Sequence, residues 1–260
     1  MQDRHSNRSR YFTEQGITTF KYVIPYIESV KPIDNSSVVL EIGCGEGGNL
    51  HPFLDKGIKV FGIELLKHQY DQAIQFYRDH KYKNNLTLIH SNIYDIDSES
   101  LPKMDVIFMK DVIEHIPDQN KLLSYLHQFL KPDGIIFFGF PPWRMPFGGH
   151  QQVCRSILSK VPYFHILPSK VYELILKLFG EDELAIKEFL EVKETGLSIN
   201  RFHKIVKENK YSILKETYWF INPNYEIKFK LKPRRVPRFL QIPWLCDFYT
   251  TAIYCAIRPN

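Results

Sequence analysis

A short glycine-rich segment between two apolar runs constrains this chain more than any other feature. Residues 38–42 read Val-Val-Leu-Glu-Ile, and four glycines follow within 43–48. A second apolar run, 59–63, leads directly into Glu64. Glycines allow backbone conformations that other residues avoid and let a ligand approach the chain closely, and a carboxylate can accept hydrogen bonds from ribose hydroxyls. The pattern predicts a strand, a tight turn, a helix and a second strand around a nucleoside-containing cofactor.

The charge around this turn distinguishes two classes of cofactor. The segment also fits the G-x-G-x-x-G pattern of dinucleotide-binding proteins. A pyrophosphate favours a helix N-terminus without negative charge nearby, whereas Glu41 and Glu46 bracket this turn. S-Adenosylmethionine carries no phosphate, and its ammonium and sulfonium groups suit neighbouring carboxylates. The residues therefore favour S-adenosylmethionine over a dinucleotide.

With the order Glu-Ile-Gly-Cys-Gly-Glu-Gly at 41–47, the chain resembles the class I S-adenosylmethionine-dependent methyltransferases, small-molecule branch, similar to the quinone-biosynthesis type. The segment 110–117 looks like the family's fourth motif, and the likeness covers 38–140. It implies S-adenosyl-L-methionine contacts from Glu41, Gly43, Cys44, Gly45, Gly47, Asn49, Glu64, Leu65, Asn92, Ile93 and Lys110. Asn92 departs from the acid usual at that place, but its amide oxygen can still accept a proton from the adenine amino group.

Alternating strand and helix patterns predict an α/β fold, a Rossmann-like doubly wound sheet that is mostly parallel. The later chain predicts a helical insertion after the fifth strand and an antiparallel C-terminal hairpin. The expected strands are 38–42, 59–63, 86–91, 104–109, 135–140, 212–221 and 248–257. The expected helices lie within 10–30, 48–56, 67–80, 119–130, 168–179, 181–191 and 198–208.

Length and composition bound the organisation of the chain. With 260 residues and 44% hydrophobic content, we expect a single methyltransferase domain over 1–260. Its expected parts are a cover helix (1–30), the cofactor-binding core (38–140), a helical lid insertion (141–196), and a last helix and strands (197–260). No run reaches the roughly 18 apolar residues of a membrane span, and the polar start does not resemble a secretory signal. Four scattered cysteines without a C-x-x-C pair fit a cytoplasmic protein.

Candidate groups for chemistry follow the fourth and fifth strands. Asp111, Glu114 and His115 form a pattern similar to the trio that binds a divalent ion in related quinone-precursor O-methyltransferases. The same pattern begins ordinary helices, so we predict no metal site. A general base is needed only if the acceptor is protonated at neutral pH. His115, Asp111 and His150 are the candidates, without an order among them.

The acceptor is expected to be a small or lipid-like organic molecule. Several aromatic side chains could face the pocket, namely Tyr11, Phe12, Trp143, Phe147, Tyr163 and Phe164. Nucleic acid is not the expected partner, because no recognised RNA-binding module accompanies the formal charge of +5. Segments 141–143 and 222–225 resemble the Asn-Pro-Pro-Tyr box only at the wrong places and predict rigid turns.

The basic stretch 228–238 predicts a solvated hairpin face or a peripheral membrane contact. We also expect segment 11–15 and loop 141–152 to cover the cofactor together at the carboxyl end of the sheet, with Gly148 and Gly149 giving the loop room to move. An RNA methyltransferase, a nucleotide-dependent oxidoreductase and a catalytically silent cofactor-binding protein remain as alternatives.

Overall fold

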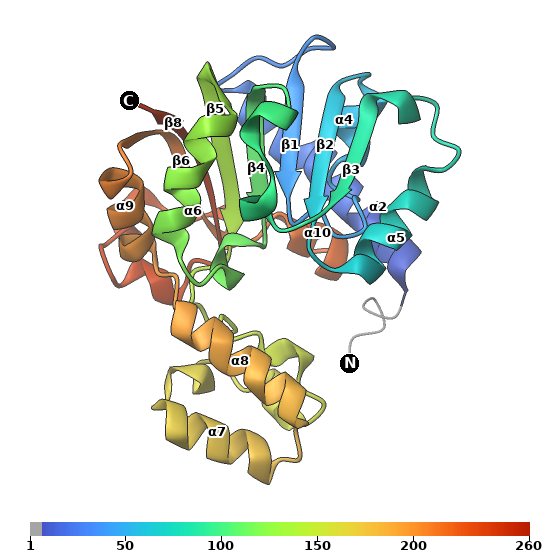
Figure 1. The fold of residues 1–260 in the computed structure, drawn as a ribbon. Helices are drawn as coiled ribbons and strands as arrows, with labels where there is room; N and C mark the ends of the chain where they lie inside the picture. Colours follow the sequence, from blue (N-terminus) through green and yellow to red (C-terminus); the bar gives the residue numbers. More distant parts are fainter. Residues whose placement is uncertain (1–6) are drawn as a thin grey trace.

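A computed structural model describes residues 7–260, which fold around one mixed β-sheet (Figure 1). Within these residues, eight strands lie in the order β3-β2-β1-β4-β5-β8-β6-β7. The strands are β1 (Val38–Ile42), β2 (Lys59–Glu64), β3 (Leu86–His90), β4 (Met104–Lys110), β5 (Leu130–Phe140), β6 (Tyr211–Ile221), β7 (Arg234–Arg235) and β8 (Ala252–Pro259). Strands β1 to β5 are parallel, and β8 pairs antiparallel with both β5 and β6. The predicted Rossmann-like α/β fold is confirmed.

Helices cover both faces of the sheet, which makes it doubly wound. On one face, α6 (Gln119–Leu126) and α9 (Ile199–Glu208) bury apolar side chains at helical spacing, among them Leu122, Leu126 and Phe202. On the other face, α3 (Ile24–Glu28) and α4 (His51–Asp55) contribute to a second apolar cluster. Helix α5 (Lys67–Tyr77) follows β2. Because both faces are covered, β4 is buried from Met104 to Met109.

Two expected helices differ in their interior or their ends. The leading helix is α2 (Arg8–Thr18), followed by a π-helical segment (Thr19–Val23) and α3. Pro25 has no N–H to donate to the preceding turn, which accounts for the changed hydrogen-bond register. The helix expected over 48–56 begins only at His51, because the chain turns before it.

The insertion after β5 forms a small layer of its own beyond the carboxyl ends of the strands (Figure 1). Its main helices are α7 (Ser169–Leu178) and α8 (Glu183–Thr195), close to the predicted ranges. They enclose a separate apolar cluster of Cys154, Leu158, Phe164, Tyr172, Leu176, Ile186 and Phe189. Glu181, which accepts the N–H groups of Arg155 and Ser156 at 3.0 Å each, joins the loop to the helical pair.

One prediction about the C-terminal part was wrong. Residues 222–225 do not form an isolated rigid turn, because α10 (Asn224–Phe229) begins there, with the Asn222 side chain accepting the Asn224 N–H. No helix in 7–260 has the length and apolar character to cross a membrane. All four cysteines are buried and free. The expected absence of a secretory signal concerns in part residues 1–6, which lie outside the described residues.

Candidate cofactor and acceptor site

The turn after β1 needs glycine at two places for two reasons. Gly43 and Gly47 have φ angles of +67° and +84°, a region that side chains disfavour. A Cβ on Gly43 would lie 2.7 Å from a methyl of Val112, and one on Gly47 would lie 2.8 Å from the Tyr77 ring. The Tyr77 hydroxyl also donates to the Gly47 carbonyl at 2.6 Å. The turn is therefore fixed by its neighbours before any ligand binds.

Glu64 ties the end of β2 to this turn. One carboxylate oxygen accepts the Gly45 N–H at 2.7 Å and the other accepts the Leu66 N–H at 2.8 Å. The residue is only 5% exposed. Each carboxylate oxygen has a further lone pair, so Glu64 can hold the turn and still accept ribose hydroxyls. The ribose contact stays a prediction.

Glu41 offers an acceptor that nothing uses. Its Oε1 accepts from Asn49 Nδ2 at 2.8 Å, and Asn49 Oδ1 accepts from the Thr19 hydroxyl at 2.8 Å. Oε2 is buried without a hydrogen-bond partner among residues 7–260. Burial raises the pKa of Glu41 well above its usual range. An ammonium group placed here would satisfy the free oxygen and stabilise the carboxylate, so the residues fit S-adenosylmethionine.

Helix α2 lies directly on the glycine turn. A Cβ on Gly48 would come within 2.6 Å of the Phe12 carbonyl, and Arg8 pairs with the buried Glu46 at 2.7 Å. The placement of segment 11–15 beside the turn is as expected, whereas its movement as a cover stays a prediction. The Phe12 ring contacts His51, Phe76 and Tyr77.

The remaining predicted cofactor residues lie at the ends of β1, β2, β3 and β4. Leu65 is 61% exposed, and Cys44 and Ile93 are buried. Asn92 Oδ1 accepts the Tyr94 N–H at 3.1 Å, which leaves its amide donors open.

Lys110 and Asp111 end β4 as an ion pair, with Lys110 Nζ 2.6 Å from an oxygen of Asp111. Burial would lower the pKa of Lys110, but the Asp111 charge outweighs it and the pKa is raised. The same charge adds to burial in raising the pKa of Tyr225 on α10. The sequence gave no sign of Tyr225 in this region except an Asn-Pro pair before a short helix.

On the acceptor side, the structure brings His115 and His150 together. Their ring centroids are 4.7 Å apart at an interplanar angle of 78°. Burial, then the neighbouring His115, lowers the pKa of His150 to about 4. His115 keeps an exposed edge, yet the protein around it also lowers its pKa, against the opposing charge of Asp111. Both rings are therefore neutral at pH 7, and each has a nitrogen that can accept a proton.

Glu114 adds a buried carboxyl group to this pair. Neither of its side-chain oxygens has a hydrogen-bond partner in 7–260, and burial raises its pKa. One ligand atom each from Glu114, His115 and His150 lie within 4.8 Å of one another. Imidazole and carboxylate are suitable ligands for a divalent ion, so the donors fit a metal, with His150 where the expected trio had Asp111. Metal-independence stays a prediction.

The glycines of loop 141–152 are explained by close contacts. A Cβ on Gly148 would lie 2.0 Å from the Trp143 carbonyl oxygen, and one on Gly149 would lie 2.4 Å from the Cβ of His165. The same Trp143 oxygen lies 2.8 Å from His165 Nε2, and the Trp143 N–H donates to the Leu197 carbonyl at 2.9 Å. These glycines let the loop pack against the insertion, a role that the expectation of mobility had missed.

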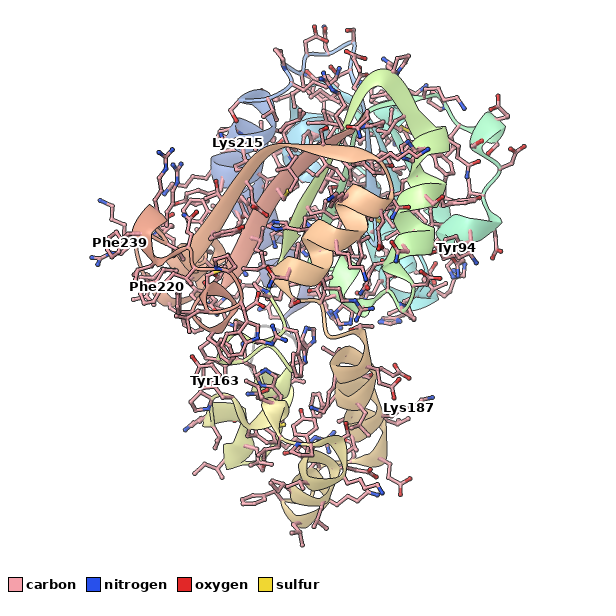
Figure 2. The ribbon with its side chains drawn as sticks, turned by 90° about the vertical axis from the view of Figure 1, so that its left-hand side faces the viewer. Tyr94, Tyr163, Lys187, Lys215, Phe220 and Phe239 are labelled. Carbon is pink, nitrogen blue, oxygen red and sulfur yellow. The ribbon has the colours of Figure 1, made fainter. Side chains whose placement is uncertain are left out.

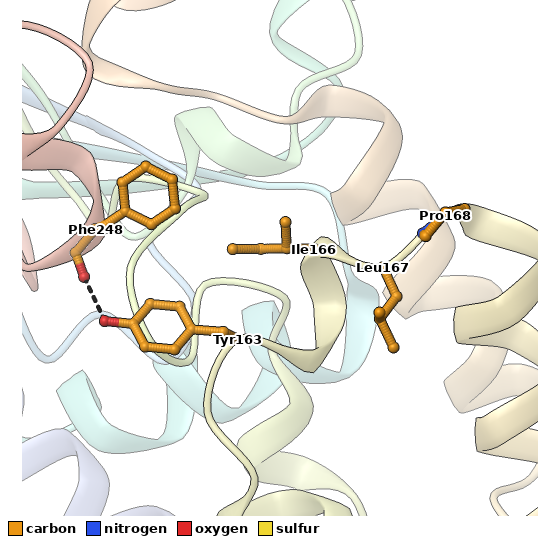
Figure 3. Close-up of a pocket in the computed structure, with 5 residues that line it drawn as sticks. All are labelled: Tyr163, Ile166, Leu167, Pro168 and Phe248. Atoms are coloured by element: carbon orange, nitrogen blue, oxygen red, sulfur yellow. Dashed lines mark hydrogen bonds between the residues drawn. The ribbon is translucent and has the colours of Figure 1, made fainter.

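An apolar hollow of about 400 Å³ opens where the insertion meets the C-terminal part of the chain (Figure 3). Tyr163 lines it and donates from its hydroxyl to the Phe248 carbonyl at 2.8 Å. The other lining residues are Ile166, Leu167, Pro168 and Phe248. Of the aromatic residues expected at a pocket, Tyr163 faces this hollow, whereas Phe164 is buried against Tyr172.

Comparison with known proteins agrees with this geometry. Residues 40–136 match the model of a family described as a methyltransferase domain. The chain is 24% identical over 216 residues to a ubiquinone biosynthesis O-methyltransferase of Rickettsia canadensis, covering 80% of each chain. It is 29% identical over 171 residues to phosphoethanolamine N-methyltransferase 2 of Caenorhabditis elegans, covering 59% of this chain and 38% of that protein.

The chain also resembles the solved structure of geranyl diphosphate C-methyltransferase from Streptomyces coelicolor, in complex with Mg²⁺, geranyl diphosphate and S-adenosyl-L-homocysteine. The TM-score is 0.57 at 14% identity, and the match covers 90% of this chain and 78% of that one. At this identity the likeness concerns the fold alone.

Proposed function

The chain belongs to the class I S-adenosylmethionine-dependent methyltransferases, and we propose that it methylates a small or lipid-like organic acceptor by in-line displacement. The observation that carries the proposal is the arrangement at the carboxyl edge of the sheet. The glycine turn and Glu41 follow β1, while the neutral pair His115 and His150 follows the adjacent strands β4 and β5. Ligands of open α/β sheets bind at this edge, where the strand order reverses.

Each side of this edge has its own task in the mechanism. When bound, the cofactor supplies a methyl group on a sulfonium, which is already a strong electrophile. Glu41 holds the cofactor's ammonium group and Glu64 its ribose, so the methyl faces the acceptor side. Alignment of reactants alone can contribute about 7–11 kcal/mol at most. For a hydroxyl acceptor, the neutral imidazole of His115 or His150 accepts the departing proton.

Two observations support an apolar acceptor. The hollow at Tyr163 and Phe248 is lined by apolar side chains. The names of two similar proteins refer to ubiquinone biosynthesis and to geranyl diphosphate, which point to acceptors with isoprenoid chains. The phosphoethanolamine N-methyltransferase shows that a small polar acceptor also occurs among the relatives.

The proposal can be tested with methyl-deuterated S-adenosylmethionine and two acceptor pools, an organic-solvent extract of cells and total RNA. Mass spectrometry should find the label in small or lipid-like molecules of the extract. The transfer should fall strongly in His150→Asn and persist in His165→Asn, because His165 faces Trp143 within the insertion. Label in RNA alone, or in neither pool, would overturn the proposed acceptor class.

A second arm of this experiment concerns the metal. Transfer should survive EDTA treatment if the histidine pair acts without an ion. Activity that is lost with EDTA and restored by Mg²⁺ or Zn²⁺ would contradict the predicted metal-independence. Glu114, His115 and His150 would then be the ligands, because their donor atoms already lie together.

A further inference from the structure

The segment 228–245, which we call the basic–aromatic edge, exposes an unusual number of large apolar side chains. Phe239 is 78% exposed and Trp244 is 55% exposed. The others are Phe229, Leu231, Leu240, Ile242 and Leu245. Single exposed apolar residues are ordinary, but a contiguous group marks a surface that binds something.

The same segment is strongly basic. It contains Lys228, Lys230, Lys232, Arg234, Arg235 and Arg238, and no acidic residue occurs between Glu226 and Asp247. Within 7–260, no salt bridge joins Lys230, Lys232 or Arg238 to an acid. Glu226, at the border of the edge, is paired with Lys21 at 2.7 Å. The partner of this surface is therefore expected to be both anionic and able to bury apolar side chains.

The backbone holds the basic–aromatic edge in a defined shape. The Val236 N–H donates to the Tyr218 carbonyl at 2.8 Å, and Gln241 Nε2 donates to the Val236 carbonyl at 2.9 Å. Trp244 has a φ angle of +69°, which is an uncommon and costly backbone for a bulky residue. Phe239 and Phe220, the neighbouring exposed residue of β6, project from the same side of the molecule (Figure 2).

The basic–aromatic edge also reaches the apolar hollow. The Trp244 ring lies 5.3 Å from the ring of Phe248, which lines the hollow. The guanidinium of Arg144 lies 5.8 Å from the Trp244 ring centroid. An apolar surface thus continues from Phe239 and Trp244 toward Phe248, with cationic groups beside it.

We propose that the basic–aromatic edge binds the surface of an anionic phospholipid bilayer. Lysine and arginine are attracted to anionic headgroups, while aromatic and aliphatic side chains enter the boundary between headgroups and acyl chains. RNA would also attract the cations, but Leu231, Leu240 and Ile242 offer no planar surface on which a base can stack. The inference concerns binding alone and does not depend on which acceptor is methylated.

The test uses the full chain and sedimentation with vesicles of phosphatidylcholine, with and without phosphatidylglycerol. Binding should require phosphatidylglycerol and weaken with added salt. Lys230→Glu combined with Lys232→Glu and Arg238→Glu should weaken binding by roughly a hundredfold or more, since each cation near the surface contributes about 1 kcal/mol. Phe239→Ser with Trp244→Ser should also lose binding, and both variants should keep their affinity for S-adenosylhomocysteine.

A matched control carries Leu178→Ser and Leu184→Ser, because these residues are 74% and 76% exposed on the insertion. This variant should bind vesicles like the unchanged chain. Equal binding to vesicles with and without phosphatidylglycerol would overturn the proposal, and so would loss of binding only in the control. Retention of an RNA oligonucleotide without any vesicle binding would identify a nucleic-acid surface instead and likewise overturn it.

Discussion

The two halves of the carboxyl edge are built in different ways. In the cofactor half, the contacts are local along the chain, as when Glu64 accepts the Gly45 N–H and Tyr77 donates to Gly47. In the acceptor half, segments far apart in the sequence must meet. The Thr195 hydroxyl donates to the Glu114 carbonyl at 2.6 Å, and Trp143 contacts both His165 and Leu197.

This difference has a physical consequence for each half. A turn fixed by nearby residues forms with little loss of chain entropy and keeps its shape without a ligand. A site assembled from distant segments depends on the whole insertion being folded. Its properties also come from burial, as the low pKa of His150 shows. Substitutions in the two halves should therefore report on different quantities, binding in one and fold stability in the other.

The largest expected effect tests the acceptor half through pH. The pKa of His150 falls from 6.5 to about 4 on folding because of burial, so the folded state binds fewer protons than the unfolded state below pH 6.5. Stability should be unaffected by this group above pH 6.5, decrease as the pH falls, and level off near pH 4. The total loss is about 2–3 kcal/mol.

His150→Asn removes this group, so its free energy of unfolding should decline less steeply below pH 6.5 in urea denaturation. His165, whose pKa burial also lowers to about 4, is present in both proteins and cancels in the difference. Identical pH profiles for the two proteins would show that His150 is not buried in the native state, and the acceptor half would lose its long-range character.

The next largest effect concerns cofactor binding. Glu64→Ala removes the acceptor for two backbone N–H groups and for the ribose, and such charge-assisted hydrogen bonds contribute about 1.5–3 kcal/mol. Calorimetry should find S-adenosylhomocysteine bound roughly tenfold to a hundredfold more weakly. Asp71→Ala, which removes an exposed acid of α5 that pairs with Lys67, is the control and should bind normally. An unchanged affinity in Glu64→Ala would remove Glu64 from the site.

The smallest effect is a proton count at Glu41. Without ligand, burial keeps the pKa of Glu41 well above its usual range and favours the neutral carboxyl group. A bound ammonium favours the carboxylate, so binding should release up to about one proton at neutral pH. The binding enthalpy should then differ between two buffers with different ionisation enthalpies. Glu41→Gln should lose that difference, and its persistence there would assign the proton to another group.

The same contrast explains which parts of the fold the sequence could predict. Strands β1 to β5 and helices α5 to α9 follow from local patterns of apolar residues and turns. The interruption at Thr19–Val23 arises from one missing N–H at Pro25, which the pattern over 10–30 cannot show. The helix at Asn224 was missed because its six residues are too few for a recognisable period.

For the site, the residues could be nominated but not all of them could be combined. The motif alone indicated Glu41, Glu64 and the glycines. His115 and His150 were each candidates, yet their contact depends on the path of loop 141–152. That path depends in turn on Gly148 and Gly149 lying against Trp143 and His165. Contacts of this kind leave no periodic signal in the sequence.

The strand order has a consequence for how the protein is made. Strand β8 lies between β5 and β6, although the chain reaches β6 and β7 first. During synthesis, β1 to β5 can assemble while the outer edge of β5 stays unpaired, and β6 has to wait for β8. Unpaired strand edges invite pairing with other chains. The nascent chain therefore passes through an interval in which two edges are open, and a chaperone that covers them should raise the yield of folded protein.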